Sequence, residues 1–98
     1  MAVGGAAVPP GRPFNLEARV SGGDVVLSWG SPSIGIGPFQ YIVEVGTASG
    51  LSNVMVAPTS ATSLGATVVP TGVYYVRTRA VAAAGISRVS NEVAVVVH

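Results

Sequence analysis

Apolar and polar side chains alternate along several short stretches of this chain. The apolar positions of residues 14–20 are Phe14, Leu16, Ala18 and Val20. The same spacing of two recurs in residues 25–29, 41–45 and 73–81. Because a strand directs successive side chains to opposite faces, this pattern predicts four strands that each turn one face toward a core.

Three further stretches have less regular patterns and also predict strands: residues 51–57, 60–69 and 90–97. We expect Pro58 to end the first of them, and Gly65 interrupts the second. Glycine, proline and short polar residues separate the strands, and residues 30–38 and 82–89 are predicted to be loops.

No segment shows the apolar period of a helix, and turn signals recur at intervals of about 8–12 residues. The sequence therefore predicts an all-β fold, a seven-stranded antiparallel β-sandwich of two sheets. A chain of 98 residues has room for one domain. We place this domain at residues 13–97 and interpret residues 1–12, rich in Gly, Ala and Pro, as an extended linker.

The inward positions of the expected strands define a candidate core. Its members are Leu16, Leu27, Trp29, Tyr41, Val43, Tyr74, Val76, Ala80, Val93 and Val95. The last strand, residues 90–97, contains Val93, Val95, Val96 and Val97 and little charge, so it could pair edge to edge with another strand if it is left uncovered.

Several motifs resemble the fibronectin type III family, and its bacterial members in particular. They are Pro13-Phe14-Asn15-Leu16, Val25-Val26-Leu27-Ser28-Trp29, Tyr41-Ile42-Val43-Glu44, the run from Gly72 to Ala80, Gly85-Ile86-Ser87 and Ser90-Asn91-Glu92-Val93. The resemblance covers residues 9–97 and implies an immunoglobulin-like sandwich with strands A, B and E facing strands C, C′, F and G. It also implies a tyrosine corner at Tyr74, four residues after Pro70. Thr78 departs from the family pattern, which usually has an apolar residue there.

The composition argues against several classes of function. The five basic residues are all arginines and are scattered, so no basic stripe for nucleic acid is present. Cysteine is absent, no apolar run is long enough for a membrane helix, and we expect no membrane insertion. The four acidic residues are dispersed and the single histidine, His98, is the last residue, so we expect no enzyme activity, metal or cofactor.

The outward face of the strand at residues 73–81 carries one group of candidate interaction residues. Tyr75, Arg77 and Arg79 share this face, and the family topology places Glu44 beside them. One interpretation is a surface ion pair of Glu44 with the arginines. The alternative is a platform that binds an anionic ligand or a glycan, with Tyr75 stacked against it.

The second group of candidates lies in the loops. Ile34 and Ile36 belong to the B–C loop, and Ile86 and Arg88 belong to the F–G loop. The implied fold brings these loops to one pole together with the N-terminal linker. The isoleucines either fold over and seal the end of the core, or they dock a preceding domain or another protein.

These observations favour a non-catalytic spacer or interaction module of a larger, secreted, multidomain bacterial protein. The alternative is a protein- or carbohydrate-binding module that uses the loops or the outer face of strand F. We expect neighbouring domains of the parent chain as partners, with protein or glycan as further possibilities. The resemblance implies an extracellular or cell-surface location.

Overall fold

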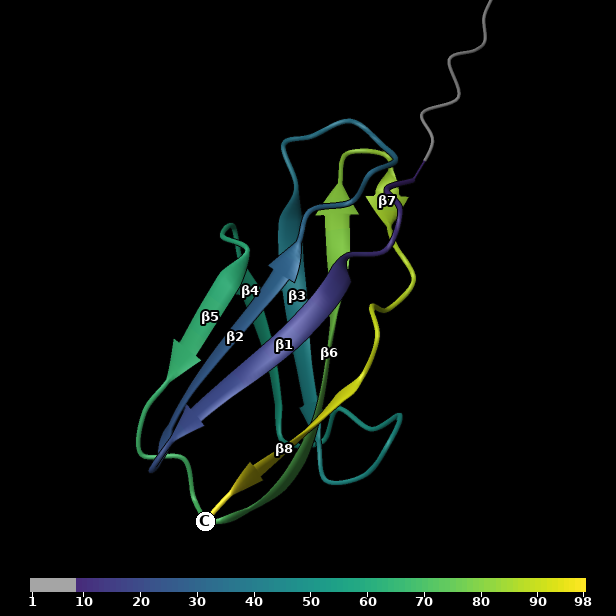
Figure 1. Ribbon diagram of the computed structural model, residues 1–98. Helices are drawn as coiled ribbons and strands as arrows, with labels where there is room; N and C mark the ends of the chain where they lie inside the picture. Colours follow the sequence, from purple (N-terminus) through teal and green to yellow (C-terminus); the bar gives the residue numbers. More distant parts are fainter. Residues whose placement is uncertain (1–8) are drawn as a thin grey trace, which may run out of the picture.

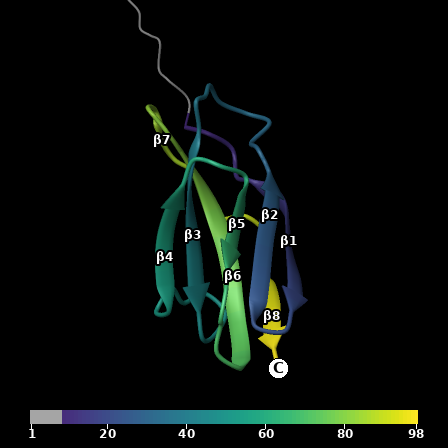
Figure 2. The same cartoon turned by 90° about the vertical axis from the view of Figure 1, so that its left-hand side faces the viewer.

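The computed structural model describes residues 9–98, which form strands and connecting loops. The strands are β1 (Phe14–Ser21), β2 (Asp24–Gly30), β3 (Gln40–Gly46), β4 (Met55–Thr59), β5 (Ser63–Ala66), β6 (Gly72–Ala82), β7 (Gly85–Ile86) and β8 (Val93–Val97). They build the two layers visible in Figures 1 and 2. The prediction of an all-β, two-sheet antiparallel sandwich is confirmed.

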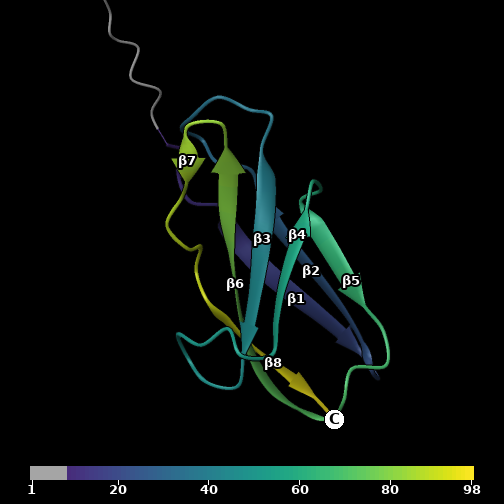
Figure 3. The ribbon, with the colours of Figure 1, turned by 180° about the vertical axis from the view of Figure 1, so that it is seen from behind.

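As expected for strands A, B and E, the strands β1, β2 and β5 form one sheet. The smaller sheet has the order β1-β2-β5, and the larger has the order β4-β3-β6, with β7 and β8 both pairing with β6. Every pairing is antiparallel. The view from behind in Figure 3 shows β3 and β6 crossing the molecule in front of the smaller sheet.

The core lies between the sheets and centres on two aromatic rings. Trp29 and Tyr41 pack edge to face, with ring centroids 5.5 Å apart. The buried apolar residues are Leu16, Val25, Leu27, Trp29, Tyr41, Val43, Val45, Val76, Ala80, Val95 and Val97. Tyr74 and Val93 are only partly buried and pack against this cluster. The Trp29 indole nitrogen is buried without a hydrogen-bond partner among the described residues, so this ring contributes through packing.

Two polar groups on β6 are accommodated by hydrogen bonds. The Tyr74 hydroxyl donates to the carbonyl oxygen of Pro70 over 2.7 Å, which is the geometry of a tyrosine corner. Thr78 is completely buried, and its hydroxyl donates to the carbonyl of Ile42 over 3.1 Å. This bond explains how a polar side chain is tolerated at a position that is usually apolar.

The prediction that Phe14 and Val20 face the core is wrong, because both side chains are exposed. Asn15 has a φ of 54°, and the pairing of β1 with β2 shifts register between Phe14 and Glu17. Such a bulge reverses the face of the residue before it, so Phe14 turns outward and its ring lies over Gly30. Val20 is exposed near the end of the hairpin that joins β1 to β2.

Several predicted boundaries are also wrong. Pro58 lies inside β4 and pairs with Ile42, which is tolerated because β4 is an edge strand that needs no N–H on its outer side. The segments predicted at residues 60–69 and 90–97 form shorter strands, β5 and β8. The expected F–G loop contains the two-residue strand β7.

Between β7 and β8 the chain leaves the ladder, and two serine side chains replace the missing partners. The buried Ser87 hydroxyl accepts a hydrogen bond from the backbone N–H of Ala80 over 2.9 Å. The buried Ser90 hydroxyl accepts one from the N–H of Thr78 over 3.0 Å. The amides of β6 therefore stay paired although their neighbour bends away.

The predicted linker at residues 1–12 falls mostly outside the described residues, since the structure describes the chain from Pro9 onward. Within the described part, Pro10 is buried, and the backbone N–H of Gly11 donates to the carbonyl of Ile34 over 2.8 Å. The last residues before the predicted start of the domain at Pro13 therefore pack against its loops.

Candidate functional site

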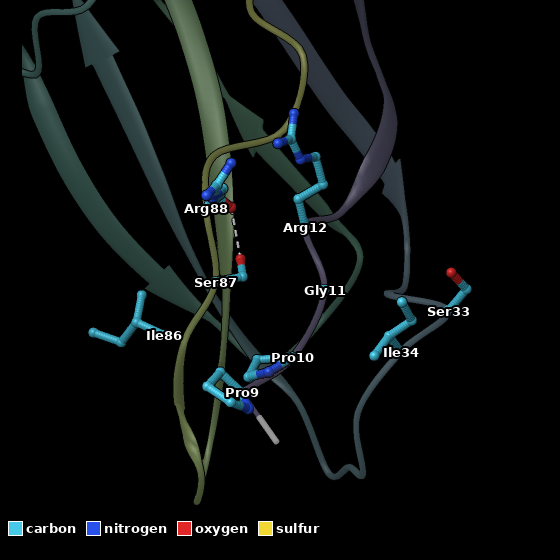
Figure 4. Close-up of a pocket in the computed structure, with 9 residues that line it drawn as sticks. All are labelled: Pro9, Pro10, Gly11, Arg12, Ser33, Ile34, Ile86, Ser87 and Arg88. Atoms are coloured by element: carbon cyan, nitrogen blue, oxygen red, sulfur yellow. Dashed lines mark hydrogen bonds between the residues drawn. The ribbon is translucent and has the colours of Figure 1, made fainter.

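A hollow lies at the pole where the chain enters the sandwich. It has a volume of about 470 Å³, and Figure 4 shows the side chains around it. Its lining comes from the entering segment, the β2–β3 loop and the β6–β8 region, and consists of Pro9, Pro10, Gly11, Arg12, Ser33, Ile34, Ile86, Ser87 and Arg88. We call this surface, together with the neighbouring Ile36, the pole hollow.

Gly35 allows the entering segment to pack closely on the β2–β3 loop, and Gly11 contacts the same loop. Gly35 has a φ of 110°, and a Cβ atom there would come within 2.8 Å of the Pro10 Cα. A Cβ atom on Gly11 would meet the Ile34 side chain at 3.4 Å. These contacts, with the hydrogen bond from Gly11 to Ile34, join the two chain segments and fix one wall of the pole hollow.

The three isoleucines of the pole hollow remain in contact with solvent. Ile34 is 61% exposed, Ile36 is 88% exposed and Ile86 is 57% exposed. In contrast, Pro10, Pro13 and Pro32 in the entering segment and the same loop are buried. The isoleucine side chains thus leave most of their surface available to another molecule, and the sealing alternative does not fit this arrangement.

Two arginines add positive charge to the apolar surface. Arg12 and Arg88 lie together on one side of the pole hollow in Figure 4, and both are exposed. Neither forms an ion pair within the described part of the chain. No acidic residue lines the pole hollow. The site can therefore offer guanidinium donors to a carboxylate beside an apolar contact area.

The second candidate surface, on the outer face of β6, is occupied by an internal ion-pair network. Arg77 Nε lies 2.7 Å from Glu44 Oε1, and Arg79 Nε lies 2.8 Å from Glu44 Oε2. Arg79 also donates from Nη1 to the carbonyl of Ser87 over 3.4 Å. The structure thus places Arg77 and Arg79 in the expected cross-strand arrangement with Glu44, with Tyr75 partly buried on the same strand.

The electrostatics of Glu44 follow from this geometry. Burial alone would raise the pKa of the Glu44 carboxyl, but hydrogen bonds from Arg79 and Arg77 and the charges of both arginines lower it more strongly. The net result is a pKa below the ordinary value. The negative charge is therefore stabilised, and it offsets one of the two positive charges that an anionic ligand would seek on this face.

The sequence reasoning recognised part of the pole hollow and missed the rest. Ile34, Ile86 and Arg88 were expected to belong to one pole, and all three line the same hollow. Arg12 was not expected to contribute, because it was assigned to the linker. The signal that could have found it is the expected position of the linker at the same pole as the B–C and F–G loops.

Residues 9–98 contain no group of three or more His, Cys, Asp or Glu side chains that could hold a metal ion. The same residues include no helix that is long and apolar enough to cross a membrane.

Comparison with known proteins relates the chain to solved structures only. No family model matches it, and no curated protein does. Domains A168–A170 of titin superpose with a TM-score of 0.77 at 23% identity, covering 92% of this chain and 32% of that one. Domains d3–d4 of the rat CD45 extracellular region give a TM-score of 0.76 at 17% identity, covering 92% of this chain and 51% of that one.

A third similar structure contains titin kinase and its flanking domains. Its TM-score is 0.74 at 23% identity, and the match covers 90% of this chain and 17% of the titin chain. The chain has a fibronectin type III-like fold. Because it spans about half or less of each of these structures, the fibronectin type III-like domain corresponds to one part of a larger chain in each case.

Proposed function

We propose that this fibronectin type III-like domain is a non-catalytic module of a larger protein and that it docks a neighbouring domain on the pole hollow. The observation that carries the proposal is the exposure of Ile34, Ile36 and Ile86 beside Arg12 and Arg88. Apolar side chains with arginine among them are the composition that protein contact surfaces favour.

The arrangement of the chain supports a role between other domains. In Figure 1 the described chain enters beside β7 and ends at the opposite pole. A sandwich with its ends at opposite poles holds its neighbours apart by its own length. The entering segment itself forms a wall of the pole hollow, so a domain that precedes this one in the chain would be delivered directly to the docking surface.

The ion pairs on the outer face of β6 favour the pole hollow as the docking surface over a ligand-binding platform on β6. Arg77 and Arg79 already bind Glu44 through their Nε atoms, so an anionic glycan would compete with an existing ion pair for these side chains. Arg12 and Arg88 need no such exchange within the described residues. An extracellular location and a bacterial source stay predictions from the family resemblance.

Limited proteolysis of the parent protein tests the docking role. Replacing Ile34, Ile36 and Ile86 together by serine removes apolar contact area, so we expect faster cleavage in the segment before Pro9 and a larger radius of gyration by small-angle scattering. The matched control is Val56→Ser with Val68→Ser, because both side chains are exposed but lie outside the pole hollow. The control should leave both readings unchanged.

Two outcomes would contradict the docking proposal. If the isoleucine variant and the unmodified protein have the same cleavage rate and the same radius of gyration, the domain is a spacer without a docking surface. Binding to a glycan array that is lost on Arg77→Gln with Arg79→Gln, and kept in the isoleucine variant, would identify the β6 face as a carbohydrate-binding surface instead.

A further inference from the structure

The five outermost described strands of the sandwich, β1, β4, β5, β7 and β8, differ in how well their open edges are protected. β7 has only two residues. β4 contains Pro58, which has no N–H to offer to another strand. β5 has only four residues. β1 carries a bulge between Phe14 and Glu17 and the charged side chains of Glu17 and Arg19. Short length, proline, bulges and charge are the usual devices that prevent two sheets from joining at their edges.

The strand β8 has five residues and β1 of the smaller sheet lies close to it, but it lacks the proline, bulge and charge that protect the other edges. It consists of Val93, Ala94, Val95, Val96 and Val97, without a charge, a proline or a glycine. Among the described strands it pairs with β6 alone. In Figure 1 it runs to the C-terminal end of the molecule with β6 on one side. Alternate residues of such an edge strand direct their backbone N–H and C=O groups outward, where another strand can bind them.

The segment that precedes β8 is fixed in place, which prepares the edge for binding. The Asn91 side chain accepts a hydrogen bond from the N–H of Leu16 over 2.9 Å and donates one to the carbonyl of Leu16 over 3.1 Å. Glu92 Oε2 accepts a hydrogen bond from the N–H of Gly50 over 3.0 Å. Because β8 is already ordered, little conformational entropy is lost when a partner strand binds.

The sequence of β8 is complementary to itself in the antiparallel direction. If two copies pair about Val95, Val93 lies opposite Val97 and Ala94 lies opposite Val96. In the same register Glu92 of each copy lies opposite His98 of the other, and an imidazole N–H can donate to a carboxylate. A formal net charge of +1 opposes the approach of two copies only weakly.

We infer that β8 is a self-association edge: two copies of this chain join antiparallel through Val93–Val97 into one continuous sheet. A two-fold axis at Val95 closes the assembly, because both copies use the same edge, β8, which is then occupied in each copy. Five residues on each side form a small contact, so the dimer is reversible and depends on protein concentration.

Analytical ultracentrifugation of the whole chain over a wide range of concentrations tests this inference. The decisive pair of variants is Val96→Lys and Val73→Lys. Val96 on β8 and its cross-strand partner Val73 on β6 are 46% and 47% exposed. Both variants add the same charge, but only Val96 lies on the open edge, where lysine opposes strand pairing. We expect Val96→Lys to weaken the dimer by about tenfold or more, and Val73→Lys to change it little.

A charge exchange tests the register. Glu92→Lys places lysine opposite His98, and His98→Glu places glutamate opposite Glu92, so each should weaken the dimer. The double variant places lysine opposite glutamate at both ends of the paired strands and should recover association. Thermal melts of each variant check that the monomer still folds, because Glu92 also binds Gly50.

Three results would overturn the inference. The chain could remain monomeric at the highest concentration measured. Val73→Lys could weaken association as strongly as Val96→Lys, which would indicate stacking of sheet faces. Association could continue into filaments, which would exclude a closed two-fold dimer.

Discussion

Two pairs of arginines in this domain differ in whether they form ion pairs. Arg77 and Arg79 lie on β6, in the middle of the larger sheet, and both bind Glu44 on the adjacent strand. Arg12 and Arg88 lie on irregular segments at the pole and have no ion-pair partner within residues 9–98. A regular sheet holds its charged side chains next to one another, whereas irregular segments can present theirs to another molecule.

The largest expected effect is the loss of the carboxylate that both sheet arginines share. Glu44→Leu leaves Arg77 and Arg79 partly buried without a partner, so the free energy of unfolding should fall by about 2 kcal/mol. Urea unfolding measures the change. Glu17→Leu is the control, because Glu17 is exposed and forms no ion pair in the described structure. Equal losses in the two variants would contradict the structural role of the sheet arginines.

The second prediction concerns the pH dependence of stability. The charge of Glu44 should account for part of the stability that is lost in Glu44→Leu. The folded pKa of Glu44 lies below its ordinary value of 4.5, so its contribution is present above that value and disappears as pH falls through the lowered pKa. The stability difference between the unmodified protein and Glu44→Gln should therefore shrink in acid. Glu92, whose pKa is lowered by hydrogen bonds from Ser49 and Gly50, is present in both proteins and cancels. A difference that is constant with pH would argue against the ion pair.

The third prediction uses an uncharged contact of the same strand as a reference. Tyr74→Phe removes the hydroxyl that donates to Pro70 and should reduce the free energy of unfolding by about 1 kcal/mol. Salt should not change this loss, whereas the loss in Glu44→Leu should become smaller at high salt. The same salt response in both variants would show that charge does not distinguish them.

The smallest effect on stability is expected at the pole. Arg12→Gln with Arg88→Gln should change the free energy of unfolding by less than about 0.5 kcal/mol, because both side chains are exposed and unpaired within the described chain. The same pair should weaken docking of the neighbouring domain, measured as faster proteolysis before Pro9. A large loss of stability would indicate that these arginines maintain the fold.

The sequence predicts most of the fold because buried strands leave a clear alternation. The faces of β2, β3 and β6 follow directly from it, whereas the tyrosine corner at Tyr74 was implied by the family resemblance. The bulge at Asn15 could not be predicted, because a single residue with positive φ reverses the face of Phe14 without changing the pattern. The position of Pro58 inside β4 depends on β4 being an edge strand, which is a property of the whole sheet.

The candidate surfaces could be predicted only in part. Alternation places Arg77 and Arg79 on the outer face of the strand at residues 73–81, and the topology implied by the family resemblance places Glu44 beside them, so this network could be predicted. The pole hollow depends instead on how three irregular segments pack, and no period in the sequence describes such contacts. Arg12 was therefore assigned to the linker, although it lies beside Arg88 at the hollow.

The hydroxyls of Ser87 and Ser90 bind the amides of Ala80 and Thr78, and these two bonds fix the number of residues between the two serines. Insertion of a single residue between Ser87 and Ser90 would move one hydroxyl out of reach and leave a buried amide without a partner. Extra residues at the exposed tip around Ala83 disturb neither contact. A peptide grafted onto this domain should therefore be inserted at that tip. The segment from Ser87 to Ser90 cannot be lengthened without the loss of one of these hydrogen bonds.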